Sequence, residues 1–142
     1  GSGAGLPGVI LSIMGHKNIV MVDSDYKKTV FIIEALRVCD TKAKVLNERI
    51  EKLDHINGKT LTFRAFAPIE KVFTLLGDKI QKETSLVFLK GKTAMEEVKN
   101  SKKVWDKLKK ENNYSLNPNF KTYNSLSDKN SKVILCTFKE CT

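Results

Sequence analysis

The sequence predicts an α/β fold built around a mostly parallel β-sheet. Short apolar segments alternate with amphipathic segments up to about residue 110, which is typical of βαβ units with helices covering both faces of the sheet. The last two strand candidates have no helix between them, so we expect an antiparallel hairpin at the sheet edge. Because no long linker interrupts the 142 residues, we expect a single domain over residues 1–142.

The first third of the chain predicts two helices with a strand between them. Pro7 stands where a helix can begin, because the first helical turn does not need the N–H that proline lacks. Residues 18–23 (NIVMVD) are apolar up to a final acid, which predicts a strand buried on both faces. Either Ser24 or Asp25 can cap the second helix, which should end near Cys39.

The rest of the chain adds strands, a short helix and a long lysine-rich helix. Pro68 opens the short helix, whose apolar positions extend to Ile80. Residues 93–110 carry apolar side chains at helical spacing among many lysines, which predicts an amphipathic helix. The predicted strands are residues 44–48, 60–66, 85–91, 114–123 and 132–138.

The charge balance indicates the kind of partner. Lysine and arginine outnumber the acids and give a formal net charge of +9. Such an excess favours a polyanion, with nucleic acid ahead of an anionic membrane surface. A general lysine bias of the genome would produce the same excess, so charge alone leaves that alternative open. No apolar run approaches the roughly 20 residues of a membrane span, and we expect no membrane partner.

The cysteines and histidines predict a reduced, cytoplasmic protein without a metal site. Cys39, Cys136 and Cys141 form an odd set with no CxxC pair, and we expect Cys39 and Cys136 to be buried apolar residues. His16 and His55 lie far apart in the sequence, and neither has a cysteine or histidine at the spacing of a metal ligand.

Four glycines at the start of the chain, Gly1, Gly3, Gly5 and Gly8, suggest a ligand-binding loop. Glycine lets the backbone adopt positive φ and approach a ligand closely, and doubly wound sheets bind ligands beyond the carboxyl ends of their strands. Asp23 closes the next strand about 20 residues later, where a carboxylate can accept hydrogen bonds from ribose hydroxyls. Together these features predict a cofactor that contains adenosine.

The spacing of the glycines fits two such cofactors. Residues 3–8 (GAGLPG) satisfy the GxGxxG pattern of nicotinamide enzymes, and residues 1–5 (GSGAG) satisfy the GxGxG pattern of S-adenosylmethionine enzymes. A nicotinamide oxidoreductase would also need a proton relay such as Tyr-x-x-x-Lys, which the sequence lacks. A flexible leader before an ordinary helix is a further alternative, and it leaves Asp23 unexplained.

Five longer segments carry a more specific signal: GSGAGLPGVILSI, MVDSDYKKTVFI, NERIEKL, FRAFAPIEKV and LKGK. In this order and spacing they resemble the bacterial small-subunit ribosomal RNA guanine-N7 methyltransferases, a family also called glucose-inhibited division protein B. The resemblance implies a class I S-adenosylmethionine-dependent methyltransferase fold, which is Rossmann-like, and methylation of guanine N7 in 16S ribosomal RNA. It also implies S-adenosyl-L-methionine as cofactor, 16S ribosomal RNA or the small ribosomal subunit as partner, and a monomer.

The resemblance, together with the glycine pattern, the predicted strand ends and the lysine excess, gives candidate site residues. Arg64 matches the arginine at the cofactor pocket, and Lys90 ends a strand on the cofactor side if that strand is parallel, so both are catalytic candidates. The candidates for RNA contacts are Lys27, Lys28 and Lys90. The cofactor-binding candidates are Gly1, Gly3, Gly5, Leu6, Asp23, Ser24, Ile50, Glu51 and Arg64.

Several of these residues also have a simpler interpretation. Ile50 can be a core residue, and Arg64 can be a surface cation that follows a strand. Glu51 can simply pair with Arg49 or Lys52, and the lysines can belong to a solvated face.

The chain departs from the family in two ways. The family has an N-terminal helical segment and a first strand before the loop, so on this resemblance we expect the chain to be N-terminally truncated and to lack a central strand. The family also usually has a serine where this chain has Phe63. A non-catalytic RNA-binding module derived from the family is therefore the alternative function. For an active enzyme, guanine N7 carries no proton, so we expect catalysis by alignment and electrostatics without a general base.

Overall fold

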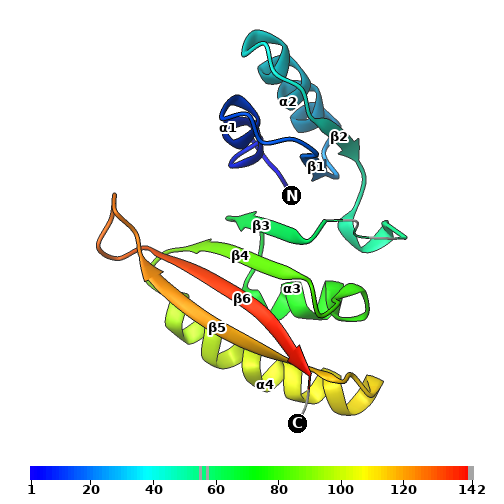
Figure 1. Cartoon of the computed structure of the whole chain (residues 1–142), viewed down its shortest axis with the longest axis vertical. Helices are drawn as coiled ribbons and strands as arrows, with labels where there is room; N and C mark the ends of the chain where they lie inside the picture. Colours follow the sequence, from blue (N-terminus) through cyan, green and yellow to red (C-terminus); the bar gives the residue numbers. More distant parts are fainter. Residues whose placement is uncertain (55, 57, 141–142) are drawn as a thin grey trace. The chain divides into compact units, whose positions relative to one another are not determined.

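The computed structural model of the chain describes residues 1–54, 56 and 58–140. These residues form two compact parts, Gly1–Asp54 and His55–Thr142, each with its own β-sheet (Figure 1). The expected single domain over residues 1–142 stays a prediction. His55 and Cys141, which entered the predictions about metal ligands and cysteines, lie outside the described residues.

The N-terminal part combines two helices with two parallel strands, drawn in blue to cyan in Figure 1. Its elements are α1 (Gly8–Ile13), β1 (Val20–Asp23), α2 (Tyr26–Val38), β2 (Lys44–Asn47) and the 3₁₀ turn Ile50–Lys52. Asp23 lies opposite Asn47 where the two strands end. Of the two predicted caps for α2, Asp25 is the one used, because its carboxylate accepts hydrogen bonds from two backbone N–H groups of the first turn.

Both helices of the N-terminal part pack on the same face of its sheet. Val9 of α1 and Ile32 and Leu36 of α2 form a buried apolar cluster with Met21 of β1. Side chains alternate between the faces along a strand, so Val20 lies on the other face, where it is 51% exposed. The prediction that this strand is buried on both faces is therefore wrong, because the two helices described for this part lie on one side.

The described residues of the C-terminal part form four strands and two helices. They are β3 (Thr60–Arg64), α3 (Ile69–Leu76), a 3₁₀ turn (Gly77–Lys79), β4 (Ser85–Lys90), α4 (Ala94–Asn112), β5 (Leu116–Asn124) and β6 (Lys132–Glu140). The strand order is β3-β4-β6-β5, with β3 parallel to β4 and with β6 antiparallel to both of its neighbours. The predicted C-terminal hairpin is confirmed, although β6 lies inside the sheet and β5 forms the edge.

An aromatic core joins both helices of the C-terminal part to one face of its sheet. The ring of Phe73 on α3 lies 5.0 Å from that of Trp105 on α4 and 6.2 Å from that of Phe138 on β6, measured between centroids. All three side chains are buried, and the indole N–H of Trp105 donates to the carbonyl of Leu116 at 2.9 Å. Because α3 and α4 share this face, the expectation that helices cover both faces of one sheet stays a prediction.

Three expectations from the sequence are corrected by local features of the chain. β3 ends at Arg64 and not at residue 66, because Ala65 has a φ of +49° that breaks the extended backbone. α3 ends at Leu76, well before Ile80, where the chain tightens into a 3₁₀ turn. Cys39 is exposed and not buried, because it caps the carboxyl end of α2.

Candidate functional site

The glycine-rich start of the chain lies along the edge of β1 that β2 leaves open. The nitrogens of Gly1 and Ser2 each donate to the carbonyl of Val22 at 2.8 Å, and the Ser2 hydroxyl accepts from the Val22 N–H at 3.1 Å. The Gly3 N–H then donates to Oδ2 of Asp23 at 2.7 Å. These bonds hold the loop at the carboxyl end of a parallel strand, where doubly wound folds bind ligands.

The carboxylate of Asp23 organises this loop from a buried position. Its other oxygen, Oδ1, accepts from the backbone N–H of Asp25 at 2.9 Å, and the residue is 4% exposed. Burial raises the pKa of Asp23, but the N–H donors of Asp25 and Gly3, together with nearby positive charge, outweigh it and hold the pKa below its ordinary value. Asp23 is therefore ionised at neutral pH. Its contact with ribose hydroxyls stays a prediction.

The glycines of the loop occupy their positions for different structural reasons. A Cβ on Gly5 would lie 2.7 Å from Cγ2 of Val9, and a Cβ on Gly8 would lie 2.6 Å from the sulfur of Met21, so both positions need glycine for packing. Gly3 has a φ of +57°, and no atom lies within 4 Å of the place where its Cβ would be. Gly3 thus presents bare backbone to open space, which is what a ligand-binding loop requires.

The end of β2 adds further predicted residues to the same edge of the N-terminal sheet. Asn47 closes β2, and its side-chain amide donates to the carbonyl of Asp23 at 3.1 Å. The 3₁₀ turn that follows carries the half-buried Ile50 and the exposed Glu51, whose Oε1 lies 3.8 Å from Nη1 of Arg49. The sequence reasoning missed Asn47, although a polar residue at the carboxyl end of a strand was a usable signal.

The remaining candidates of the N-terminal part lie near the same strand end. Leu6 is half-buried in the loop, and Ser24 is exposed between β1 and α2. Lys27 and Lys28 are exposed in the first turn of α2, and within the described residues their ammonium groups make no hydrogen bond or ion pair. They are therefore available to a ligand, and their predicted contact with RNA stays a prediction.

Arg64 ends β3 in the C-terminal part and is exposed. Within the part of the chain that the structure describes, its guanidinium has no hydrogen-bond or ion-pair partner. The preceding Phe63 faces the opposite side and is buried, with its ring stacked 5.1 Å from that of Phe88. The phenylalanine at the position where the family usually has serine is thus a core residue.

Lys90 ends β4, which is parallel to β3, so the two catalytic candidates do lie at the carboxyl ends of neighbouring strands. The Lys90 ammonium, however, donates to the carbonyl of Ala67 at 2.6 Å and lies 2.8 Å from Oε2 of Glu97. Its side chain is only 10% exposed. This arrangement favours a structural role for Lys90, and its predicted contact with RNA stays a prediction. No sequence pattern indicated Glu97, and the FRAFAP segment, which contains Ala67, gave no role to that carbonyl.

The predicted site residues thus form two groups. Gly1, Gly3 and Asp23 are joined directly by hydrogen bonds or through neighbouring residues in the N-terminal part. Arg64 and Lys90 belong to the C-terminal part, at the carboxyl ends of its two parallel strands. The assignment of Arg64 to the cofactor pocket stays a prediction.

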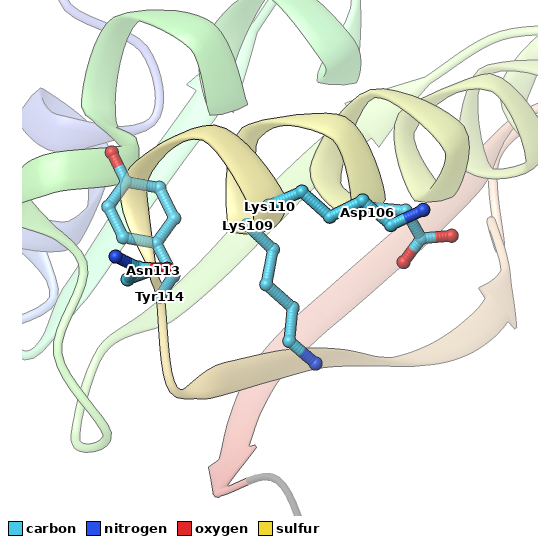
Figure 2. A pocket seen from close by; sticks show the side chains of 5 residues that line it. All are labelled: Asp106, Lys109, Lys110, Asn113 and Tyr114. Carbon is cyan, nitrogen blue, oxygen red and sulfur yellow. The ribbon is translucent and has the colours of Figure 1, made fainter.

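A surface hollow of about 550 Å³ lies at the other end of the C-terminal part, and Figure 2 shows its lining. It is formed by Asp106, Lys109, Lys110, Asn113 and Tyr114, where α4 ends and β5 is about to begin. Lys109 extends toward β5 and donates to Asn117 at 2.8 Å. β5 and β4 both run antiparallel to β6, so the hollow lies near the strand starts and contains none of the predicted site residues.

Comparison with known sequences gives a consistent result. The profile of the family described as "rRNA small subunit methyltransferase G" matches residues 1–122. The chain is 36% identical over 106 residues to the Ribosomal RNA small subunit methyltransferase G of Paramagnetospirillum magneticum, covering 75% of this chain and 52% of that protein. It is 35% identical over 105 residues to the enzyme of the same name from Rickettsia rickettsii, covering 74% and 54%. The chain therefore spans about half the length of these relatives.

Comparison with solved structures shows the fold. A rRNA methylase from Streptococcus thermophilus has a TM-score of 0.57 at 15% identity, and the match covers 100% of this chain and 84% of that one. A ribosomal protein L11 methylase from Lactobacillus delbrueckii subsp. bulgaricus has a TM-score of 0.63 at 12% identity, covering 100% and 67%. The predicted class I methyltransferase fold, α/β and Rossmann-like, is confirmed.

Proposed function

The chain belongs to the rRNA small subunit methyltransferase G family, and on that premise we propose that the protein methylates guanine N7 of one guanosine in 16S ribosomal RNA, with S-adenosyl-L-methionine as donor. The observation that carries this proposal is the loop at β1. Gly3 offers bare backbone beside open space, and the ionised, buried Asp23 fixes that backbone at the carboxyl end of the strand.

The residues at this strand end fit S-adenosyl-L-methionine. Gly1, Gly3, Gly5 and Leu6 form the loop that would hold it, and each oxygen of Asp23 accepts one described N–H, which leaves lone pairs for ribose hydroxyls. Ser24 lies beside Asp23, and we assign the adenine end to Ile50 and Glu51 in the turn after β2. When bound, the sulfonium of the cofactor supplies an electrophilic methyl group.

The task of the protein's own residues in this reaction is to bind the cofactor and the guanosine and to orient them. Guanine N7 is a lone pair without a proton, so no side chain has to remove one. Rate enhancement then comes from alignment, which supplies about 7–11 kcal/mol in favourable cases, and from fixed charge. We assign Arg64 to this task because its exposed guanidinium has a fixed fork of donors that suits a carboxylate or a phosphate.

The proposed substrate agrees with the charge of the chain. The net charge is +9, and Lys27 and Lys28 are exposed at the start of α2. The outer face of α4 adds the exposed lysines Lys99, Lys102, Lys103, Lys107 and Lys110. N7 lies on the major-groove edge, which A-form RNA hides, so we propose an unpaired guanosine as target. We further propose that the protein acts as a cytoplasmic monomer; none of the described helices is long and apolar enough to cross a membrane.

The test is methyl transfer with the position of the label mapped. The intact protein is incubated with methyl-labelled S-adenosylmethionine and either small ribosomal subunits or free ribosomal RNA from a strain that lacks the modification. We expect label at one guanosine, with strand scission there after reduction and aniline treatment, which is diagnostic of N7-methylguanosine. Label on an exocyclic nitrogen would contradict the N7 assignment. Binding of cofactor and RNA without transfer would support the non-catalytic module instead.

A further inference from the structure

We propose that Glu97 is a positioning residue that fixes the loop directly after Arg64, and that it acts through the Lys90 ammonium. The inference rests on the proposed function, because it concerns the reaction in which Arg64 takes part. Glu97 lies in the first turn of α4, seven residues after Lys90, and no motif in the sequence indicates a role for it.

One carboxylate ties together four segments at the carboxyl end of the C-terminal sheet. Oε2 of Glu97 lies 2.8 Å from Nζ of Lys90 at the end of β4 and accepts from the backbone N–H of Ile69, the first residue of α3, at 3.1 Å. Oε1 accepts from the hydroxyl of Thr93, just before α4, at 3.1 Å. The Lys90 ammonium in turn donates to the carbonyl of Ala67 in the loop after β3 at 2.6 Å.

The pair is poorly hydrated, which makes its two charges depend on each other. The side chains of Lys90 and Glu97 are 10% and 17% exposed. Little water reaches such a place, so removal of the Glu97 charge leaves the ammonium without its counter-ion. The same part of the chain offers a matched control in Lys82 and Glu140. This second lysine–glutamate pair has the same 2.8 Å separation, but its side chains are 58% and 66% exposed.

The loop after β3 has a backbone conformation that contacts from other segments must stabilise. It leaves β3 through Ala65, whose φ of +49° is uncommon for a residue with a Cβ and persists where the surroundings impose it. The bonds to the Ala67 carbonyl and the Ile69 N–H anchor the far side of the loop. Arg64 at the near side has no side-chain partner of its own within the described residues. The place from which its side chain reaches a ligand is therefore set by the end of β3 and by the loop that Glu97 and Lys90 hold.

The experiment compares Glu97→Gln with the control Glu140→Gln in the intact protein. Glutamine keeps the size of the side chain but places a neutral amide beside the Lys90 ammonium. For Glu97→Gln we expect hydrogen exchange at the Ile69 amide to be about tenfold faster. We also expect single-turnover methyl transfer to be at least tenfold slower, a change of about 1.4 kcal/mol in barrier. Glu140→Gln should change each quantity less than twofold.

A double-mutant cycle separates positioning from a general effect on the fold. If Glu97 acts by orienting Arg64, Glu97→Gln should cause no further loss of rate in an Arg64→Lys background. Equal rate losses in both backgrounds, or an unchanged rate with faster exchange at Ile69, would overturn the inference. Absence of transfer by the wild-type protein would instead overturn the proposed function.

A milder variant covers the case in which Glu97→Gln does not fold. Thr93→Val removes only the hydroxyl that bonds Oε1 of Glu97. We expect it to slow transfer about two- to threefold in the wild-type background and to have no effect in the Arg64→Lys background. A loss of the same size in both backgrounds would contradict the proposal.

Discussion

The two compact parts of the chain differ in how much apolar surface they bury. In the C-terminal part, Phe73 and Trp105 are at most 1% exposed and lie in ring contact. The buried cluster of the N-terminal part consists of smaller side chains, and most of the exposed large apolar residues of the described chain belong to this part. They are Ile10, Ile13, Met14, Val20, Tyr26, Val30, Phe31, Ile33 and Val38.

This difference shows that the two groups of candidate site residues are held in place by different interactions. Apolar burial contributes roughly 25 cal/mol per Å², so a core of large aromatic rings stabilises its part more than a cluster of aliphatic side chains does. The loop at β1 depends on backbone hydrogen bonds and on the buried carboxylate of Asp23. The loop after β3, which directly follows Arg64, is anchored instead to helices packed on an aromatic core.

The largest expected effect is on stability. Phe73→Ala removes a ring that contacts Trp105, Phe120 and Phe138, and we expect it to lower the free energy of unfolding by about 3–5 kcal/mol. Met21→Ala in the N-terminal cluster should cost about 2 kcal/mol, the low end for such a truncation, because the side chains around it are small aliphatic ones. Urea unfolding followed by far-ultraviolet circular dichroism measures both. An equal or larger loss of unfolding free energy for Met21→Ala would contradict the conclusion that the C-terminal core contributes more stability than the N-terminal cluster.

The next effect concerns cofactor affinity. Asp23→Asn removes the charge that holds the Gly3 N–H, and we expect S-adenosylhomocysteine to bind more weakly by about 1–3 kcal/mol. Asp25→Asn is the matched control, because asparagine caps a helix as well as aspartate does and should leave binding unchanged. Titration calorimetry gives both affinities. Equal affinities for wild type and Asp23→Asn would leave Asp23 as a structural residue of the loop.

A smaller effect is expected at Arg64. Arg64→Lys keeps the charge but loses the planar fork of donors, and we expect methyl transfer to ribosomal RNA to fall at least tenfold, about 1.4 kcal/mol in barrier. Arg37→Lys on α2, where Arg37 pairs with Glu34 on the surface, is the control and should not change the rate. Weaker cofactor binding would assign Arg64 to the cofactor, and weaker RNA binding alone would assign it to RNA. Unchanged turnover and affinities would make Arg64 a surface cation.

The smallest effect concerns neither stability nor activity. It is a difference in reactivity between one thiol of each part. Burial raises the pKa of Cys136 on β6 to about 12, whereas Cys39 is exposed at the end of α2. At pH 7.5, about one unit below the pKa of a free thiol, iodoacetamide should modify Cys39 and leave Cys136 unmodified in the folded protein. Peptide mass spectrometry reads both sites. Equal labelling rates would mean that the C-terminal core opens readily.

The order of elements could be predicted from the sequence because hydrophobic periodicity and turn residues are local signals. The loop at β1 was also predictable, since glycine spacing and an acid at the end of the next strand are visible along the chain. The Lys90–Glu97 pair was not, because it joins a strand end, a helix start and a distant loop that only packing brings together. The break of β3 at Ala65 escaped for a similar reason, since alanine carries no signal for positive φ.

The position of Trp105 has a consequence for optical spectroscopy. It is the single tryptophan of the chain, it is 1% exposed, and its indole N–H is bonded to the Leu116 carbonyl. An indole shielded from water emits at shorter wavelength than a hydrated one, and the tryptophan fluorescence of this protein reports on the C-terminal part alone. Circular dichroism records the helices of both parts. Loss of helical signal before the change in tryptophan fluorescence would show that the N-terminal part, with its loop at β1, can unfold while the aromatic core stays folded.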